Sequence, residues 1–368
     1  MKYFLIAGER SGDLHGGNLV KQIIKDDPGA DVLGYGGDYM KDAGMRLLMH
    51  YKDISFMGFL EVLQNLGVIR RAMKRCKEQI KVEMPDVLIL IDYPGFNLRM
   101  ARYAHEIGLK TAYYISPKIW AWKKGRIKLI KAYVDRMFVI FPFEVPFYQK
   151  LQYPVTFVGN PLVEYIDHYS FSGIDIDTSP FRHIVAFLPG SRSQEIRNSI
   201  QIIVELAALR HKDLFLIAAV DNVDSTLYDS LAGLGNVMVR YNETYEILKI
   251  ADVSITTSGT ATLETALIGT PQMVCYRTSP ISYYIARAVV SIRFISLVNL
   301  IADAEVVKEF IQQNYTLEII DEELNRILRD ETYREKIMLN YARVRELLSG
   351  ESASVNTSRE LQHWLRSS

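Results

Sequence analysis

The chain has 368 residues, of which 49% are hydrophobic and 23% charged, so a disordered chain is excluded and two folded domains are expected. Cys76 and Cys275 stand far apart and outside any C-x-x-C pattern, which argues against a disulfide scaffold or a thiolate metal site and fits a reducing cytoplasm. Net charge is zero, yet residues 1–165 hold 24 Lys and Arg against 17 Asp and Glu, which suits an anionic partner or simply solvated helix faces.

The first apolar run, Tyr3–Ala7, has the length of one buried strand and is too short for the core of a signal peptide. No apolar run approaches the roughly 18 residues that a membrane-spanning helix needs. We therefore expect a soluble protein, or at most a peripheral one.

Short apolar runs alternate with longer amphipathic segments almost throughout, which is typical of parallel βαβ units. In the first half, strands are expected at Lys2–Ala7, Val32–Tyr35, Val87–Ile91, Thr111–Ile115 and Arg136–Ile140. Helices are expected there at Asp13–Lys25, Phe59–Val82, Leu98–Ile107 and Glu144–Leu151.

The second half repeats this alternation after a linker at Gly159–Pro161 and the polar stretch Asp167–Pro180. Its strands are expected at Ile184–Leu188, Leu214–Ala218, Val237–Val239, Val253–Thr256 and Gln272–Cys275. Its helices include Gln194–Leu209, Glu243–Ile250 and Thr260–Ile268, and from about Asp303 the pattern predicts helix only.

Two features at strand ends of the first half are candidates for ligand contact. The glycine-rich run Gly8–Gly17 (GERSGDLHGG) is neither a Walker A loop nor G-x-G-x-x-G, which removes support for ATP hydrolysis and dinucleotide redox chemistry. It fits a close-approach loop where ligands dock in open α/β sheets, and the lone His15 in the helix beyond it is typical of a packing or capping residue. Asp92 ends an apolar strand, so it is either a general base or the N-cap of the next helix.

Two stretches in the second half, Ala186–Ile196 and Ser254–Glu264, each read as a strand, a small-residue turn and a helix start. A helix start offers free N–H groups and the positive end of its dipole, so the pair suggests a diphosphate clamp. Ser191 and Gln194 have capping-box spacing, which predicts a helix beginning just after Gly190, with Arg192 in its first turn to grip the anion.

Ser258, Gly259 and Thr260 begin the second of these helices, and Glu264 follows one turn deeper on the same face. A carboxylate there can accept hydrogen bonds from sugar hydroxyls, or it is simply an exposed helical glutamate. The Asp175-x-Asp177 pair lies in the polar linker, away from any glycine-rich strand end, so no metal site is expected.

The apolar stretch Ser55–Ile69 runs into the basic segment Arg70–Lys81, which predicts either a membrane-surface element or a buried helix with a solvated basic end. A second aromatic and basic cluster that could meet lipid headgroups consists of Trp120, Trp122, Lys123, Lys124 and Arg126. Nucleic acid is not expected as a partner, since no nucleic-acid module accompanies these charges.

Taken together in chain order, the motifs resemble the lipid-A-disaccharide synthase family from Phe4 to about Gln312. The matching segments are AGERSGDLHGG, GYGG, MGFLEVL, DYPGFNL, YYISPKIWAW, FPFEVPFY, FVGNPL, LPGSRSQEI, TSGTATLE, MVCYR and LVNLIA. Gly95, Asn160 and Val298 depart from the family pattern, where Asp, His and Pro are expected.

The resemblance implies a GT-B fold, an α/β architecture of two Rossmann-like lobes whose parallel sheets face each other across a cleft. The acceptor and lipid lobe would span residues 1–165 and the UDP-sugar lobe 166–345, with a helix at 346–368 packing back on the first lobe. The implied reaction moves 2,3-diacylglucosamine from its UDP derivative to 2,3-diacylglucosamine 1-phosphate. It would give UDP and a β-1,6 disaccharide for lipid A biosynthesis, at the inner face of the cytoplasmic membrane.

The resemblance also implies roles for individual residues. Asp92 would be the catalytic base, and Arg192 would stabilise the leaving UDP in place of a metal or cofactor. The nucleotide site would be formed by Gly190, Ser191, Arg192, Ser258, Gly259, Thr260, Glu264, Tyr276, Arg277 and Asn299. The acceptor site would be formed by Gly8, Glu9, Ser11, Gly12, Asp13 and His15. Acyl chains, the bilayer and lipid phosphates would be met by Leu60, Val62, Leu63, Leu66, Ile69, Arg70, Arg71, Lys74 and Arg75.

Three other functions fit the same pattern less well. A UDP-sugar epimerase would share the nucleotide clamp but needs no apolar rim such as Ser55–Ile69. A transferase to a polyprenyl-linked acceptor is closer, and a two-lobed binding protein without turnover is a third alternative. The oligomeric state is left open by the sequence, with a homodimer as one arrangement.

Overall fold

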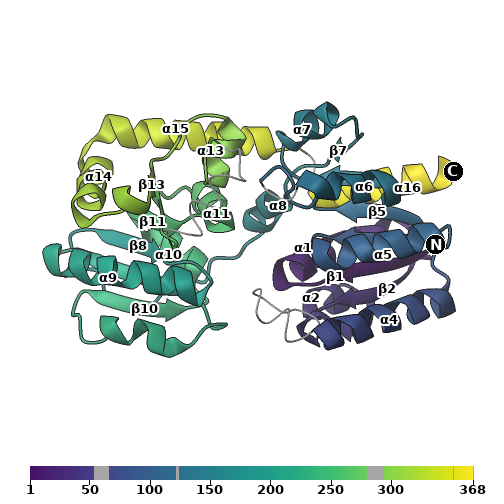
Figure 1. Cartoon of the computed structure of the whole chain (residues 1–368). Helices are drawn as coiled ribbons and strands as arrows, with labels where there is room; N and C mark the ends of the chain where they lie inside the picture. The colour runs from purple at the N-terminus through teal and green to yellow at the C-terminus, as the bar shows by residue number, and fades with distance from the viewer. Residues whose placement is uncertain (54–65, 122–123, 280–292, 351, 368) are drawn as a thin grey trace. The chain divides into compact units, whose positions relative to one another are not determined.

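The computed structural model describes residues 1–53, 66–121, 124–279, 293–350 and 352–367. Within them the chain divides into two compact units, here called unit 1 (residues 1–161 with 348–368) and unit 2 (residues 162–347). The boundaries expected from the sequence, 165/166 and 345/346, lie within a few residues of these divisions. Each unit is built around one parallel sheet (Figure 1).

The sheet of unit 1 has the strand order β3-β2-β1-β4-β5-β6-β7, and every neighbouring pair is parallel. Its strands are β1 (Lys2–Ala7), β2 (Asp31–Gly36), β3 (Arg46–His50), β4 (Val87–Ile91), β5 (Lys110–Tyr114), β6 (Arg136–Val139) and β7 (Thr156–Phe157). The central strands β1 and β4 are continuous apolar runs because helices cover both faces of a parallel sheet.

The helices of unit 1 alternate with these strands (Figure 1). They are α1 (Arg10–Asp26), α2 (Asp38–Asp42), α4 (Leu66–Glu83), α5 (Pro94–Glu106), α6 (Ile127–Tyr133), α7 (Glu144–Lys150) and, from the end of the chain, α16 (Ala353–Ser367). Short 3₁₀ turns lie at Tyr51–Asp53 and Lys124–Arg126. Successive residues of each strand enter opposite cores, as Phe4 and Leu5 do, so the sheet separates two apolar layers.

Helix α16 packs on α1 and therefore belongs to unit 1 although it ends the chain. Leu361 is fully buried in the core beneath α1, and the Ser358 hydroxyl donates to Asp26 at 2.7 Å. The ring of Trp364 lies 5.8 Å from the ammonium of Lys110 and 5.7 Å from the guanidinium of Arg136. These apolar and cation–π contacts hold the carboxy-terminal helix on the first unit.

The sheet of unit 2 has the strand order β10-β9-β8-β11-β12-β13, again parallel throughout. Its strands are β8 (Ile184–Leu188), β9 (Leu214–Ala219), β10 (Val237–Tyr241), β11 (Val253–Thr257), β12 (Gln272–Tyr276) and β13 (Glu309–Ile311). Its helices are α8 (Pro161–Asp167, across the boundary), α9 (Ser193–Leu209), α10 (Thr244–Ile250), α11 (Thr260–Ile268), α13 (Leu297–Ala302), α14 (Leu317–Arg329) and α15 (Glu331–Leu348). Two 3₁₀ turns lie at Ser225–Leu231 and Gln312–Asn314.

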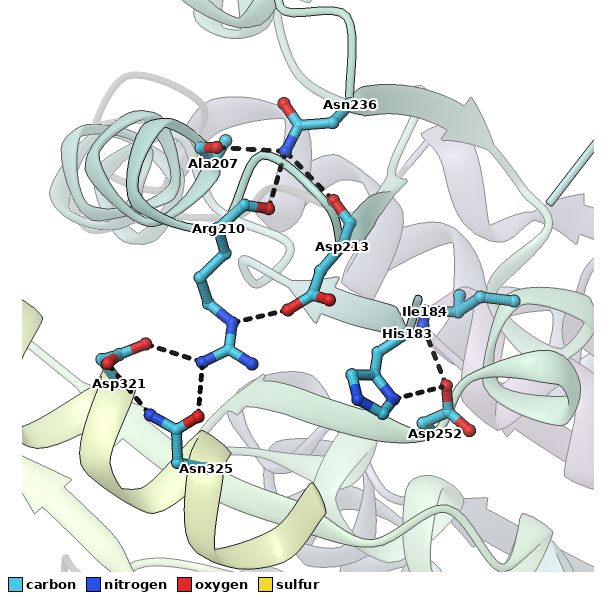
Figure 2. Close-up of polar contacts among 9 residues, drawn as sticks. All are labelled: His183, Ile184, Ala207, Arg210, Asp213, Asn236, Asp252, Asp321 and Asn325. Atoms are coloured by element: carbon cyan, nitrogen blue, oxygen red, sulfur yellow. Dashed lines mark hydrogen bonds and ion pairs between the residues drawn. The ribbon is translucent and has the colours of Figure 1, made fainter. Parts of the chain in front are cut away.

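A buried ion network fixes α14 to the corner between α9 and β9 (Figure 2). The Arg210 side chain is only 10% exposed, and its guanidinium donates to Asp213 and to Asp321 at 2.7 Å each. Asn325 accepts a further hydrogen bond from Arg210 at 3.1 Å and donates to Asp321 at 3.1 Å. This corner lies at the amino end of β9, opposite the edge where the candidate site is found.

The structure corrects several sequence-based expectations. The strands β3, β7 and β13 were not predicted, and β13 contradicts the expectation of helix alone after Asp303. Each is an edge or near-edge strand of only partly buried residues, so the apolar signal is weak. The expected linker contains α8, and α2, α6 and α13 were also missed. The predicted helix at residues 59–82 is found as α4 from Leu66, while 59–65 fall outside the described residues.

Candidate functional site

The strand order of unit 1 reverses between β1 and β4, since β2 follows β1 on one side and β5 follows β4 on the other. Ligands of open α/β sheets dock at such a switch point, beyond the carboxyl ends of the strands. Ala7 pairs with Ile91 at this edge, so the loops that begin at Gly8 and Asp92 leave the sheet side by side. The topology therefore brings the glycine-rich loop and the candidate base together.

Asp92 has a strained backbone and does not cap the next helix. Its φ is 43°, and Tyr93, with φ 48°, is the residue at the N-cap position of α5, so the N-cap interpretation of Asp92 is wrong. The Asp92 carbonyl accepts hydrogen bonds from Asn97 Nδ2 at 2.7 Å and from the Tyr113 hydroxyl at 2.5 Å. Consecutive non-glycine residues in the left-handed region persist only where surrounding contacts enforce them, and they cluster at functional sites.

Burial is the main cause of an altered acidity at Asp92. It raises the pKa of the half-buried carboxyl to about 6, and the negative charge of Glu9 adds to this effect. The positive charges of Lys118 and Arg126 oppose the rise in pKa. A carboxylate with such a pKa is ionised at neutral pH yet is a better proton acceptor than an ordinary aspartate.

The other residues of the first loop divide into ligand-accessible and structural positions. Glu9 and Ser11 are partly or fully exposed, and the Ser11 hydroxyl donates to Glu9 at 3.3 Å. At Gly8 any side chain would overlap the ring of Tyr93, so the close approach explains this glycine. Burial lowers the pKa of His15 to about 4, so its imidazole stays neutral near pH 7, and its Nδ1 has no partner within the described residues.

Asp13 is a structural residue of this loop, which corrects its assignment to the acceptor site. Its buried carboxylate accepts the N–H groups of Gly37 at 2.6 Å, Tyr39 at 3.1 Å and Met40 at 3.1 Å, and so holds the start of α2. Gly12 is buried within α1, so this residue of the first turn packs inside unit 1.

The sheet of unit 2 reverses between β8 and β11, and there the two small-residue turns leave the sheet side by side. Helix α9 begins at Ser193, so the predicted capping box and a start just after Gly190 are wrong. Arg192 occupies the N-cap position with extended backbone, and its side chain is 74% exposed. Glu195 accepts from Ser191 N at 3.2 Å and from Arg192 Nη1 at 2.9 Å, in place of the expected cap.

Helix α11 begins at Thr260 as the sequence predicted, with Gly259 at its N-cap. Gly259 has φ 157° and no side chain that could cap the helix, and the N–H of Thr262 donates to the Gly259 carbonyl at 3.3 Å. The N–H groups that a ligand could bind in the first turn of α11 are therefore those of Thr260 and Ala261. The hydroxyl of Ser258 donates to the carbonyl of Ile295 at 2.8 Å. The turn therefore offers chiefly backbone donors.

Glu264 is half-buried one turn into α11 rather than an exposed surface glutamate. Its carboxylate accepts a hydrogen bond from the Tyr245 hydroxyl at 2.9 Å, and burial raises the pKa of Glu264. A fixed carboxylate in this position can accept further hydrogen bonds from a sugar hydroxyl.

Of the three remaining candidates for the nucleotide site, Tyr276 and Arg277 are accessible, whereas Asn299 is buried. Tyr276 ends β12 half-buried, and the Arg277 guanidinium donates to the Tyr315 carbonyl and lies 5.0 Å from that ring. Asn299 has no exposed surface, and its amide bonds Val306, Val307 and Glu309. Its hydrogen-bonding capacity is used by the fold, so the assignment of Asn299 to the nucleotide pocket is not supported.

Helix α4 carries the basic face expected beside lipid phosphates. Arg70, Arg71, Lys74 and Arg75 are exposed, with one ion pair between Lys74 and Glu78 at 3.9 Å. Ile69 is buried in the core of unit 1, so its predicted contact with acyl chains or the bilayer is wrong. Leu60, Val62, Leu63 and the side chain of Leu66 lie outside the described residues, as do Trp122 and Lys123.

The three residues that we expect to depart from the family pattern lie in different surroundings. Gly95 is exposed in open space, Asn160 donates to the carbonyl of Ile140 at 3.1 Å, and Val298 is fully buried. Sequence reasoning gave no role to Glu144, Lys118 or Tyr113, which the structure places at the edge of the same sheet. The signal available was position, since each lies at or just after a strand end.

The described residues also bear on metal binding and on crossing a membrane. Across those residues no group of three or more His, Cys, Asp or Glu side chains is arranged to hold a metal ion. In the same part of the chain, the helices lack the combination of length and hydropathy that crossing a bilayer requires.

Solved structures of other proteins are similar to this chain in fold, at low sequence identity. The chain is similar to solved structures of the glycotransferase of kitacinnamycin (TM-score 0.67, 12% identity, 99% of both chains). It is also similar to UDP-GlcNAc 2-epimerase from Neisseria meningitidis bound to UDP-GlcNAc (TM-score 0.65, 13% identity, 100% of both chains). At this identity the likeness concerns the fold, and it confirms the expected GT-B class of two Rossmann-like units.

Sequence similarity is much stronger to one family. The lipid-A-disaccharide synthase of Geobacter metallireducens is 39% identical over 364 residues, which cover 96% of this chain and 94% of that protein. The family described as lipid-A-disaccharide synthetase matches residues 3–361. The chain therefore belongs to the lipid-A-disaccharide synthase family.

Proposed function

We propose that this protein is an inverting glycosyltransferase that moves 2,3-diacylglucosamine from its UDP derivative to 2,3-diacylglucosamine 1-phosphate. The products are UDP and the β-1,6-linked disaccharide 1-phosphate of lipid A biosynthesis. The observation that carries this proposal is membership of the synthase family over nearly the whole chain. Epimerases share the fold at about a third of that sequence identity, so the epimerase alternative is less well supported.

In the proposed mechanism, Asp92 takes the proton from the acceptor 6-hydroxyl. The oxygen attacks the anomeric carbon of the donor, and the bond to the β-phosphate breaks with its electron pair leaving on UDP. Inversion follows because attack and departure occur on opposite faces of the sugar. The raised pKa of Asp92 suits this role, since the ionised form still predominates at neutral pH.

Unit 2 is proposed to hold the nucleotide. The N–H groups of Thr260 and Ala261 at the start of α11 and the exposed guanidinium of Arg192 can neutralise the diphosphate as negative charge develops on it. On binding, Arg192 would exchange its surface ion pair with Glu195 for the phosphate oxygens. Glu264 would hold the ribose, its orientation set by Tyr245. We propose that these donors replace a divalent metal.

We further propose that the protein lies at the inner face of the cytoplasmic membrane, because both substrates carry acyl chains. The exposed basic face of α4, formed by Arg70, Arg71, Lys74 and Arg75, is suited to anionic lipid headgroups. Flotation with vesicles tests this point. Replacing these four residues with Gln should abolish binding to vesicles that contain phosphatidylglycerol, and binding by the variant equal to wild type would contradict it.

The activity is tested by incubating the purified protein with both lipid substrates in detergent and EDTA. Disaccharide detected by mass spectrometry would support the reaction and its independence from metal. Disaccharide formed only after Mg²⁺ is restored would overturn the metal proposal alone. UDP release without the acceptor would instead favour an epimerase.

A further inference from the structure

A pocket of about 300 Å³, here called the amino-edge pocket, is lined in part by the Arg210 network of unit 2. Three pieces of chain line it: residues 182–183 just before β8, the turn 209–213 between α9 and β9, and helix α14. The turns that form the candidate nucleotide site follow the carboxyl ends of β8 and β11. The amino-edge pocket lies at the other edge of the same sheet and is therefore a separate place on unit 2.

The backbone that lines the pocket is fixed by tertiary hydrogen bonds (Figure 2). The side-chain amide of Asn236 donates to three carbonyls, those of Ala207 at 3.0 Å, Arg210 at 3.2 Å and Asp213 at 3.0 Å. The N–H of Arg182 donates to the carbonyl of Lys212 at 2.7 Å, which ties the chain before β8 to the same turn. Side chains on this backbone are therefore preorganised, which lowers the entropic cost of binding a ligand between them.

Arg210 supplies a donor at the pocket that the fold does not use. Its side chain is 10% exposed, with Nε bonded to Asp213 and Nη1 bonded to Asp321 and Asn325. In the part of the chain that the structure describes, its Nη2 has no hydrogen-bond partner, and Figure 2 draws no contact to it. Buried N–H donors are nearly always paired, so this nitrogen marks a place for an acceptor oxygen.

Three further cations surround the pocket, and their charges are not balanced within the fold. Arg182, Lys212 and Arg329 line it and are exposed, and none of them forms an ion pair with another described residue. The two carboxylates of the lining, Asp213 and Asp321, are both bound to Arg210. Four arginine and lysine charges therefore face two carboxylates, and the net positive charge favours an anion.

We propose that the amino-edge pocket binds a phosphate group: Arg210 Nη2 donates to one phosphate oxygen, and Arg182, Lys212 and Arg329 close around the others. A phosphate monoester offers several anionic oxygens to these donors, and guanidinium groups match their geometry. The assignment does not depend on the proposed glycosyl transfer, because it concerns other residues at the opposite edge of the sheet.

The lining of the pocket limits the ligand to this class. Leu209 is the one apolar residue among the described residues that line it, so an acyl chain finds no apolar wall there. A divalent cation would be repelled by the surrounding arginine and lysine side chains. A volume of about 300 Å³ is at the small end for ligand sites and suits a phosphate with a small organic group.

The test uses inorganic phosphate with the full-length protein, and saturating UDP occupies the candidate nucleotide site. Thermal unfolding is compared in phosphate and in sodium chloride of equal ionic strength. For a Kd of about 1 mM, phosphate at about 20 mM should raise Tm by about 2 °C or more. The triple variant Arg182→Gln, Lys212→Gln and Arg329→Gln should lose most of this shift, since its Kd should rise at least about tenfold.

A matched control shows whether the position of the charges matters. Lys336→Gln removes an exposed positive charge from α15, away from the pocket, and should keep the full shift in phosphate. Equal shifts in wild type and the triple variant would overturn the proposal, as would a wild-type protein that phosphate stabilises no more than chloride does. If the triple variant does not fold, the single variants Lys212→Gln and Arg329→Gln carry the same comparison. Arg210 is left intact because its two ion pairs hold α14 in place.

A second arm identifies the source of the phosphate group, which is either a soluble molecule or a lipid headgroup. Glycerol 3-phosphate carries the monoester in solution, and vesicles with phosphatidic acid carry it at a membrane surface. A triple variant that loses stabilisation by glycerol 3-phosphate but floats with the vesicles as wild type does would assign the pocket to soluble phosphates. A variant that also loses flotation would assign it to the headgroup. A variant that keeps both properties would overturn the proposal.

Discussion

Asp92 and Arg210 are both charged side chains with limited exposure, but their surroundings differ in kind. Arg210 is paired with Asp213 and Asp321 and hydrogen-bonded to Asn325, so its charge is compensated where it lies (Figure 2). Asp92 has a pKa raised to about 6 because burial and Glu9 outweigh the nearby positive charges. A buried charge that is paired with opposite charges stabilises the fold. A buried carboxylate whose charge is only partly balanced has a raised pKa and can therefore accept a proton near neutral pH.

The largest expected effect is on Asp92→Asn, which removes the base but preserves shape. We predict that kcat falls by about a thousandfold, within the range for loss of general base catalysis, while the Kd for UDP changes little. Rates come from disaccharide formation and affinities from calorimetry. Glu106→Gln, an exposed carboxylate on the adjoining helix α5, should keep wild-type turnover. Near-normal turnover in Asp92→Asn would show that the base is elsewhere.

Arg210→Ala should affect stability rather than chemistry. Leaving Asp213 and Asp321 without their partner should lower the free energy of unfolding by about 3 kcal/mol or more. Urea unfolding monitored by circular dichroism measures this. Arg102→Ala, which breaks an exposed pair with Glu106, should cost less than about 1 kcal/mol. Equal losses in the two variants would contradict the distinction drawn between buried and exposed pairs.

Arg192→Ala tests whether the exposed guanidinium of Arg192 binds the diphosphate of UDP. Loss of one charge-assisted contact to the diphosphate should weaken UDP binding by about tenfold and lower the rate as well. Calorimetric titration with UDP gives the affinity. Arg197→Ala, an exposed arginine further along α9, is the matched control and should bind UDP normally. Unchanged UDP affinity in Arg192→Ala would remove this residue from the clamp.

The smallest expected effect is on Tyr245→Phe, which removes the donor that orients Glu264. We predict a few-fold loss of UDP affinity, in line with about 1 kcal/mol for one hydrogen bond to a carboxylate that keeps access to water. Tyr241→Phe, a partly exposed tyrosine of β10, should leave the affinity unchanged. If the two variants bind UDP alike, Glu264 is not held for the nucleotide by Tyr245.

The sequence was sufficient for features that depend on local pattern. Continuous apolar runs gave β4, β9 and β11 to within one residue, and the turn before Thr260 gave the start of α11. The alternation of strands and helices predicted parallel sheets, and strand order then placed Asp92 at a switch point. Such predictions need only the periodicity of apolar residues and the residue preferences of helix starts.

The roles of residues that contact partners far away in the chain could not be predicted from the sequence. Asp13 and Asn299 look like site residues along the chain, but neighbours far away in sequence use their polar atoms. Ile69 follows an apolar, membrane-like stretch, yet it belongs to the core. Nothing in the local sequence indicates that Glu144 accepts a hydrogen bond from Ser116, because the two residues are 28 positions apart. Tertiary hydrogen bonding decides which polar residues remain available for a ligand.

The acid limb of kcat/KM for the wild-type protein tests the central claim most directly, that Asp92 is a base whose acidity is set by incomplete compensation. Because the base must be ionised, activity should fall as pH drops through about 6, with one proton taken up. His15, with its pKa lowered to about 4, would not produce this limb. Burial raises the pKa of Glu144 to about 7, so the limb must also persist near pH 6 in Glu144→Gln if it belongs to Asp92. Activity that stays level down to about pH 4.5 would mean an ordinary aspartate and would contradict the account.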